Sequence, residues 1–464
     1  MLRNPNYVYG PQSALVPANI NFGDYILELL WKHRQNVAMI NGFTEESLTY
    51  ADIAQQAMNF AVSLNRMGVR KGDTIGLMSE NRREFWGAVV GVVCSGAVLT
   101  TISTGYVKGE IIHVTNISKP KYIICSPIMY KLHAKTLKSL NFVKKIIVFG
   151  EEKQNGALVY NDLVFENKGR IKNVKYEEFR SVDVQGQTDT LFILYSSGTT
   201  GLPKGVMLTH LNVITACSLP SSANPTVIAL TITPWYHVMG LVGVLTSFVT
   251  GRTAVYLPKF DVDTYLKTVE KYRVVHLTVV PPILVAICKN QSKYDLSSVR
   301  LIYSGAAPLH KDTIQSVAEK FPNLQGLFQG YGSTEMTLAV LKFNPSDPNT
   351  HKIGTVGCVV ANTVVKVPPA ELEAVLLQHE GIRDAAVIGV EDRTAGEVPL
   401  AFVVAQPGKT LTEAEVKQFV AVRLSNPKHL RGGVRFVDQI PKSASGKLLR
   451  KDLRKMLKTA KSKL

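Results

Sequence analysis

Residues 191–205 read LFILYSSGTTGLPKG, a short apolar run that turns directly into a loop of serine, threonine and glycine. Such a run is typical of a buried strand, and the glycines let the following backbone turn its N–H groups toward an anion. Four hydroxyls add donors, and Lys204 adds a positive charge. Proline before the lysine and glycine after it distinguish the loop from a Walker A motif. A flexible surface loop is the alternative, but the apolar run that feeds this loop favours a strand ending in a polyphosphate-binding turn.

Three later segments repeat this design of an apolar strand that ends in small or turn-forming residues. They are VIALTITP then WYHVMG at 227–240, VVHLTVV then PPILVAI at 274–287, and RLIYSG then AAPL at 300–309. Ligands of open α/β sheets lie beyond the carboxyl ends of the strands. We therefore expect these turns and the loop at 196–201 to converge on one site.

The region from about residue 25 to 150 alternates helical patterns with short β-branched runs. Helices are predicted over 54–68 and from Arg83, and strands over 74–79, 121–126 and 144–150. This alternation predicts parallel, doubly wound α/β sheets. The charged stretch from 151 to 178 is interpreted as a surface connection.

The sequence pattern after Pro368 differs from that of the preceding region. PPAELEAVLLQH at 368–379 predicts a helix with proline at its start, and 385–390 and 400–405 predict strands. Thr412 to Glu415 form the pattern of a capping box that opens another helix. We therefore predict a large N-terminal α/β domain over 1–367 and a small α+β domain over 368–464.

The composition is that of a globular protein, with 45% hydrophobic and 19% charged residues. Part of the net charge of +17 belongs to the tail from Lys447 to Leu464, which lacks interleaved aromatic residues, so no nucleic-acid partner is expected. Two uncharged stretches, 85–107 and 227–251, are broken by glycine and hydroxyl residues, which favours buried core over a transmembrane segment. Five widely spaced cysteines, without a metal-binding pattern, favour reduced thiols.

The two ends of the sequence bear on localisation. The first residues, MLRNPNYVYGPQS, lack the apolar region of a secretory signal. The last three, Ser462-Lys463-Leu464, are the address that the peroxisomal import receptor reads. The sequence therefore predicts a peroxisomal protein.

Four further motifs extend the pattern over nearly the whole chain. They are PWYH at 234–237, SGAAPL at 304–309, QGYGSTE at 329–335 and IPKSASGK at 440–447. With the loop at 195–205, this set resembles the adenylate-forming enzymes, which include acyl-CoA synthetases, 4-coumarate:CoA ligases and beetle luciferases. The resemblance implies that a carboxylic acid, fatty or aromatic, reacts with ATP in the presence of Mg²⁺ to give an acyl-adenylate, which then passes to coenzyme A. Luciferin monooxygenation and a non-catalytic binding protein remain the alternatives.

The resemblance also implies roles for individual residues. Lys447 would bridge the carboxylate and the α-phosphate, Thr334 and Glu335 would act on the nucleotide with Glu335 holding Mg²⁺, and His237 would wall the acyl site. Lys259 would contact a phosphate of coenzyme A. The residues expected to bind the nucleotide are Ser196, Ser197, Gly198, Thr199, Thr200, Gly201, Lys204, Ala306, Gln329, Gly330 and Tyr331.

The chain departs from the family pattern where TVVKVPPAELEAVL, at 363–376, joins a strand to a helix without a spacer. The family places a segment there with a Thr-Gly-Asp motif that clamps the ribose, an arginine, the domain hinge and a Lys-Gly region. No Thr-Gly-Asp occurs in this chain, and no arginine lies between Arg300 and Arg383. We therefore expect a shortened family member with an intact phosphate and acyl half-site, exposed strand edges in a truncated barrel, and impaired adenylation.

Overall fold

The computed structural model describes residues 7–12, 16–166, 172–196, 202–218, 228–343, 355–366, 369–392, 396–424, 428–442 and 448–461. The chain forms two compact units, one of residues 14–360 and one of residues 361–464 with 1–13. The sequence prediction placed the boundary slightly later, between 367 and 368. β19 (Val364–Lys366) nevertheless belongs to the C-terminal unit, because it pairs antiparallel with β1 (Tyr7–Tyr9).

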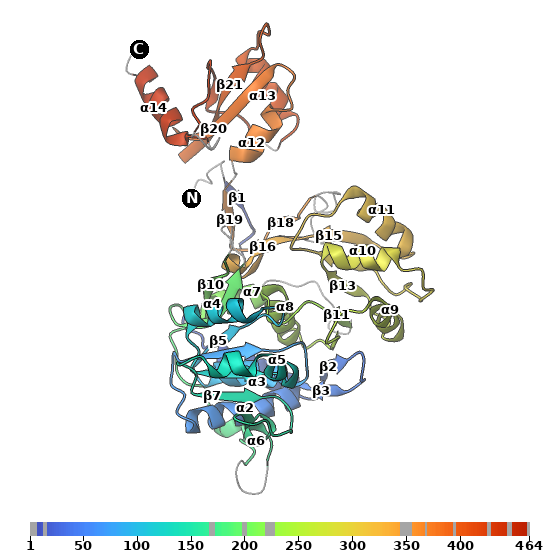
Figure 1. The fold of residues 1–464 in the computed structure, drawn as a ribbon. Helices are drawn as coiled ribbons and strands as arrows, with labels where there is room; N and C mark the ends of the chain where they lie inside the picture. Colours follow the sequence, from blue (N-terminus) through green and yellow to red (C-terminus); the bar gives the residue numbers. More distant parts are fainter. Residues whose placement is uncertain are drawn as a thin grey trace. The chain divides into compact units, whose positions relative to one another are not determined.

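The first sheet of the 14–360 unit has the strand order β10-β9-β5-β4-β6-β7-β8 and is parallel except for the edge strand β10 (Figure 1). Its strands are β4 (Thr74–Met78), β5 (Val98–Thr101), β6 (Tyr122–Cys125), β7 (Lys145–Val148), β8 (Leu158–Val159), β9 (Thr190–Ser196) and β10 (Lys204–Thr209). The run LFILY is therefore the body of β9, as predicted.

The second sheet has the order β15-β14-β13-β11-β12-β2-β3 and is parallel except for the β2–β3 pair. Its strands are β2 (Val37–Asn41), β3 (Ser47–Thr49), β11 (Ala229–Thr231), β12 (Ala254–Tyr256), β13 (His276–Val279), β14 (Leu301–Ser304) and β15 (Gly326–Gln329). A small antiparallel sheet of β16 (Tyr331–Ser333), β17 (Leu338–Lys342) and β18 (Cys358–Val359) follows it.

Helices cover both sheets in layers. Helices α4 and α5 pack on one face of the first sheet, helices α9, α10 and α11 pack on one face of the second, and the remaining helices form the largest core between the two sheets. The helices are α1 (Phe22–Lys32), α2 (Tyr50–Arg66), α3 (Glu84–Cys94), α4 (Lys108–Ser118), α5 (Pro127–Lys138), α6 (Asn161–Val164), α7 (His210–Cys217), α8 (Val238–Val249), α9 (Val262–Lys271), α10 (Pro281–Lys289) and α11 (Lys311–Lys320).

Several of these helices begin at a residue that caps them. Thr49 and Asp52 form a capping box at the start of α2, and Thr209 with Asn212 form one at the start of α7. Asp261 accepts from the backbone of Thr264 and so starts α9. The local sequence therefore fixes where these helices start, and apolar burial fixes which face turns inward.

The C-terminal unit is a three-stranded sheet with helices on both faces. β20 (Ile382–Asp392) pairs antiparallel with β21 (Gly396–Ala405), which pairs parallel with β22 (Gly433–Phe436). Helices α12 (Pro369–Leu376) and α13 (Glu413–Ala421) pack on one face, and α14 (Arg450–Lys461) packs on the other. The predicted capping box of Thr412 and Glu415 is present at the start of α13.

The α/β class with a small α+β domain is thus confirmed, and two details differ from the sequence prediction. The stretch 151–178 is more than a surface connection, because Leu158 and Val159 extend the first sheet as β8 and short helices α6 and η1 (Tyr176–Glu178) follow. The four similar strand units also divide between two sheets, with β9 in the first and β11, β13 and β14 in the second. Within the described part of the chain, no helix is both long and apolar enough to span a bilayer.

Candidate active site

The last residue of β9 and the first turn after β16 meet at one hydrogen bond. Ser196 donates its hydroxyl to Oε1 of Glu335 at 2.8 Å, although the two residues are 139 positions apart. Lys204 begins β10 directly opposite Ser196 in the β9–β10 ladder. The phosphate-loop strand, its lysine and the carboxylate of the QGYGSTE motif are therefore neighbours.

Glu335 is exposed in the short helix η2 (Thr334–Met336), and its surroundings favour the ionised form. Its pKa is lowered by its own backbone N–H, then by the Ser196 and Ser333 hydroxyls and by the charge of Lys204. A carboxylate, a hydroxyl and an ammonium group thus face one solvent-accessible point. Such a set can bind a phosphate together with a divalent cation.

The turns after β14 and β15 are tied to each other. Gln329 accepts the N–H of Leu309 through Oε1 at 2.9 Å, and Gly330 donates its N–H to the carbonyl of Ser304 at 2.9 Å. Ala306 has a φ of 70°, in the left-handed region that glycine adopts at lower cost. It stands where the resembled SGGAPL motif has its second glycine, so this chain keeps the turn but adds backbone strain.

Gly332 in the QGYG segment is required by a close backbone approach. A Cβ there would lie 1.5 Å from the carbonyl oxygen of Leu338, on the adjacent strand β17. The ladder between β16 and β17 shifts its register between Tyr331 and Gly332. The side chain of Tyr331 is 60% exposed, and the resemblance expects an aromatic ring beside the adenine at this position.

His237 immediately precedes the first residue of α8. Met239, in the first turn of α8, places its Cε 3.8 Å from the position a Cβ on Gly305 would take. The ring of His237 packs against Tyr236 at 4.7 Å between centroids, and desolvation lowers its pKa although part of the side chain reaches solvent. The start of α8 and the turn after β14 therefore face one another.

A residue that the sequence prediction missed positions this segment. Asn81 is buried, accepts the N–H of Trp235 at 2.9 Å and donates to the carbonyl of Thr233 at 3.3 Å. Thr101, at the end of β5, donates its hydroxyl to the carbonyl of Tyr236 at 2.6 Å. A single asparagine has no periodic or motif signal, so only the tertiary structure reveals its role.

The remaining predicted residues are either apart from this cluster or outside the description. Lys259 is exposed after β12, where its charge acts on Asp261, and no described contact connects it to Ser196 or Glu335. The residues at 197–201, Lys447 and the tripeptide 462–464 lie outside the described residues. Their roles stay predictions.

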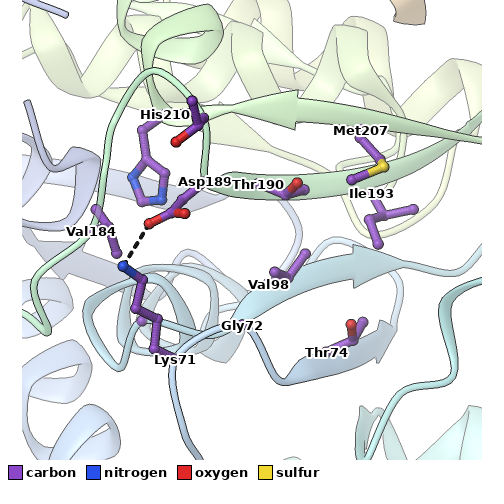
Figure 2. A pocket seen from close by; sticks show the side chains of 12 residues that line it. Lys71, Gly72, Thr74, Val98, Val184, Asp189, Thr190, Ile193, Met207 and His210 are labelled. Atoms are coloured by element: carbon purple, nitrogen blue, oxygen red, sulfur yellow. Dashed lines mark ion pairs between the residues drawn. The ribbon is translucent and has the colours of Figure 1, made fainter. Parts of the chain in front are cut away.

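A separate pocket of about 350 Å³ lies at the amino ends of the parallel strands β4, β5 and β9. Ser196 lies at the other end, the carboxyl end, of β9. Figure 2 shows Lys71 and Asp189 joined across it by an ion pair of 2.8 Å, with the ring of His210 beside them. His210 is 3% exposed and accepts the N–H of Phe22 through Nδ1 at 3.1 Å, which connects the starts of α7 and α1. This pocket holds none of the predicted site residues.

His210 makes stability depend on pH. Burial, partly opposed by Asp189, lowers its pKa to about 4. The unfolded chain, with a histidine pKa of about 6.5, therefore binds more protons between these values, and the stability present above about pH 6.5 is lost as pH falls toward 4. We expect the free energy of unfolding to drop by about 2 kcal/mol between pH 7 and pH 5 through this residue. In the variant His210→Asn, the amide oxygen of asparagine can accept the hydrogen bond that Nδ1 accepts. Urea unfolding of this variant should show a smaller drop in the free energy of unfolding between pH 7 and pH 5. A drop as large as that of the unchanged protein would contradict the assignment of this pH dependence to His210.

The two seven-stranded sheets, the contact between Ser196 at the end of β9 and Glu335 in η2, and a separate small unit at the C-terminus are those of an α/β enzyme of the adenylate-forming class. The chain belongs to the AMP-binding enzyme family. Residues 30–381 match the AMP-binding enzyme model, and residues 371–447 match the AMP-binding enzyme C-terminal domain.

Individual relatives agree with this assignment. The chain is 30% identical to luciferin 4-monooxygenase of Photuris pensylvanica over 548 aligned positions, which cover 100% of both chains. It is 33% identical to 4-coumarate–CoA ligase 1 of Petroselinum crispum over 528 positions, covering 95% of this chain and 94% of the relative. Among solved structures, a red-emitting luciferase of Phrixothrix hirtus superposes with a TM-score of 0.67 at 30% identity, covering 98% and 99% of the two chains.

The comparisons also bear on the join before α12. The alignment with the Photuris relative spans 548 positions, whereas this chain has 464 residues, so the relative has residues for which this chain has no counterpart. The two family matches overlap at 371–381, which leaves no residues between them.

Proposed function

We propose that this protein is an acid–thiol ligase, an AMP-forming acyl-CoA synthetase. The observation that carries this proposal is the Ser196–Glu335 hydrogen bond beside Lys204, in a chain of the AMP-binding enzyme family. ATP, coenzyme A and a fatty or aromatic carboxylic acid are the proposed substrates.

The proposed reaction has two steps. In the first, a carboxylate oxygen of the acid bonds to the α-phosphorus of ATP and the bond from that phosphorus to the bridging oxygen of pyrophosphate breaks. In the second, the thiol sulfur of coenzyme A bonds to the acyl carbon, its proton passes to solvent, and AMP leaves. Negative charge develops at phosphate oxygens in the first step, so catalysis depends on donors and cations.

The residues of this chain supply such groups. Lys204 offers a cation and Ser196 a hydroxyl to phosphate oxygens, and Lys447 is proposed to bring a second cation to the α-phosphate. Glu335 and Ser196 fit Mg²⁺ only as part of a larger shell, since the described residues contain no group of three or more His, Cys, Asp or Glu side chains able to hold a metal. Nucleotide oxygens and water would complete that shell, and the ion would offset the charge of the phosphates. His237 and Met239 would border the acyl group.

The missing segment is proposed to slow the first step. In the family pattern that segment supplies the ribose clamp, an arginine and the hinge, and charge-assisted hydrogen bonds are worth roughly 1.5–3 kcal/mol each. In this chain Val367 is followed directly by Pro368, without that segment. If the join hinders rotation of the small domain, Lys447 reaches the site less often.

Acid-dependent exchange of labelled pyrophosphate into ATP tests the first step, and mass spectrometry of the thioester tests the second. We expect exchange with fatty or hydroxycinnamic acids, slower than that of the Petroselinum relative, and thioester formation with coenzyme A. A chain that binds acid or nucleotide in calorimetry but supports no exchange would instead be a binding protein. Exchange at the relative's own rate would contradict the proposed impairment.

Luciferin monooxygenation is the second candidate, because the relatives at 30% identity include the Photuris luciferin 4-monooxygenase and the Phrixothrix luciferase. Light emission with luciferin, ATP and oxygen, without thioester formation, would establish it. The peroxisomal location is a separate proposal that rests on residues 462–464. A fluorescent fusion that still enters peroxisomes without Leu464 would contradict it.

A further inference from the structure

The pocket at the amino ends of β4, β5 and β9 is remote from the candidate active site. Strand β9 runs for seven residues from Thr190, which lines the pocket, to Ser196, so about 20 Å separates the two ends. The volume of about 350 Å³ has room for roughly ten water molecules. A Cβ placed on Gly72, another lining residue, would have no heavy atom within 4 Å. The pocket therefore offers space for a small molecule, and no step of the proposed reaction uses it.

One wall of this pocket is apolar. Ile193 in β9 and Met207 in β10 are register partners, and Val98 lies two residues before Thr100, which is the partner of Ile193 in β5. Val98, Ile193 and Met207 therefore lie on the same face of the first sheet. The side chain of Met207 is 67% exposed. This wall can cover a small apolar group, because such a group would remove exposed apolar surface from water.

The opposite side of the pocket carries one charge of each sign. Nζ of Lys71 and Oδ2 of Asp189 form the 2.8 Å ion pair, and the same oxygen accepts the N–H of Gln185 at 2.7 Å. The other oxygen, Oδ1 of Asp189, has no hydrogen-bond partner among the described residues. Lys71 has three N–H groups, of which the ion pair uses one. The two side chains stay 45% and 31% exposed, so a ligand can reach both.

His210 adds a buried donor beside this ion pair. Nδ1 accepts the N–H of Phe22, so in the neutral ring Nε2 carries the hydrogen. Burial lowers the pKa of His210 to about 4, which keeps the ring neutral at about pH 7. Nε2 has no hydrogen-bond partner within the described part of the chain, and Figure 2 shows the ring beside Lys71 and Asp189. A ligand oxygen that accepts from Nε2 would satisfy a donor that is otherwise unpaired.

We propose that this pocket binds a free α-amino acid with an apolar side chain. Its carboxylate would accept from Lys71 and from Nε2 of His210, its ammonium group would donate to Oδ1 of Asp189, and its side chain would lie on the apolar wall. The two charged groups of an α-amino acid are attached to one carbon, so they can lie side by side as Lys71 and Asp189 do. A monocarboxylate would place its charge beside Asp189 without compensation, and an amine would leave the donors of Lys71 and His210 unused.

Three ligands with the same apolar group test the need for both charges. Leucine has both charges, 4-methylpentanoate has only the carboxylate, and 3-methylbutylamine has only the ammonium group. Titration calorimetry of the full chain at about pH 7 measures the dissociation constant of each. We expect about 1 mM or lower for leucine, and binding at least about tenfold weaker for each of the other two.

Variants of the pocket should change these affinities in opposite ways. Asp189→Asn keeps an oxygen for the N–H of Gln185 and should weaken leucine at least about tenfold, but should not weaken 4-methylpentanoate. Lys71→Met should weaken leucine and 4-methylpentanoate but not the amine. His210→Asn keeps an acceptor for Phe22, lacks the Nε2 hydrogen, and should also weaken leucine but not the amine. A carboxylate bound at the candidate active site would respond to none of these changes.

A control outside the pocket separates specific from general effects. Lys175→Met removes an exposed pair with Glu178, at 3.2 Å, and should leave the dissociation constant of leucine unchanged. Because the ion pair of Lys71 and Asp189 is also accessible to solvent, their variants should melt close to the unchanged protein. The inference is overturned if leucine does not bind, if it binds no more tightly than both analogues, or if Asp189→Asn leaves its affinity unchanged. None of these outcomes depends on pyrophosphate exchange, so this inference and the proposed function stand or fall separately.

Discussion

Glu335→Gln is expected to lower acid-dependent pyrophosphate exchange about 100- to 1,000-fold relative to the unchanged chain. Glutamine keeps the shape and an oxygen that can accept from Ser196, so the change removes only the negative charge beside Lys204. In the proposed reaction, that charge would help to hold the cation that accompanies ATP. Because Glu335 is exposed, the free energy of unfolding should change little. Discontinuous assays of pyrophosphate exchange measure the activity, and urea unfolding measures the free energy of unfolding.

Two further variants show whether the charge or its orientation matters. Ser196→Ala keeps the carboxylate but removes the 2.8 Å hydrogen bond, and should lower exchange less than Glu335→Gln does. Glu319→Gln, on the exposed face of α11, should leave exchange unchanged. Since the surroundings lower the pKa of Glu335, its protonation should not reduce exchange between about pH 6 and 8. Exchange by Glu335→Gln within threefold of the unchanged chain would remove Glu335 from the catalytic site.

The fold could be predicted from the sequence where local patterns are long. The alternation over 25–150 predicted β4, β6 and β7 nearly at their observed bounds and the start of α3 within one residue, because these segments are mostly apolar and buried. β8 was missed, since Leu158 and Val159 form a strand only by pairing with β7 at the sheet edge. Which sheet each strand joins was also unpredictable, because strands of both sheets are equally apolar.

In the candidate site, motifs predicted individual residues, whereas their contacts depend on the tertiary structure. The motifs identified Ser196 and Glu335 singly, but their hydrogen bond spans 139 residues and depends on how the two sheets pack. Asn81 was missed for a different reason. It is a single polar residue without a motif, and its importance lies in being buried, which a single residue in a sequence does not reveal.

The C-terminal unit contains one strong internal contact beside the predicted catalytic loop. Glu373, in α12, is 7% exposed and accepts two bonds from Nη2 of Arg450, at 2.7 Å to Oε1 and 2.9 Å to Oε2. The same carboxylate accepts the N–H of Val387 in β20 at 2.8 Å. Arg450 begins α14, three positions after Lys447. The ion pair of Glu373 and Arg450 therefore connects α12 to the first residue of α14, which follows the segment that contains Lys447.

Arg450→Met is expected to destabilise the C-terminal unit by about 3 kcal/mol, because it leaves the Glu373 carboxylate buried with a single N–H donor. All three tryptophans, Trp31, Trp86 and Trp235, lie in the other unit, so tryptophan fluorescence should not report the change. Hydrogen exchange measured by mass spectrometry on peptides of β20 and β21 should show it as lost protection.

The double variant Glu373→Gln with Arg450→Met should recover part of the lost stability, because it contains neither charge of this pair. If the double variant recovers none of the lost stability, the two residues do not act as a buried ion pair. Lys417→Met, which breaks the exposed pair with Glu413 on α13, should cost under about 1 kcal/mol. If Lys447 acts from a loop anchored by α14, exchange should fall in Arg450→Met and return partly in the double variant. Exchange that stays unchanged while protection is lost would show that the first half-reaction does not need the small domain in this shortened chain.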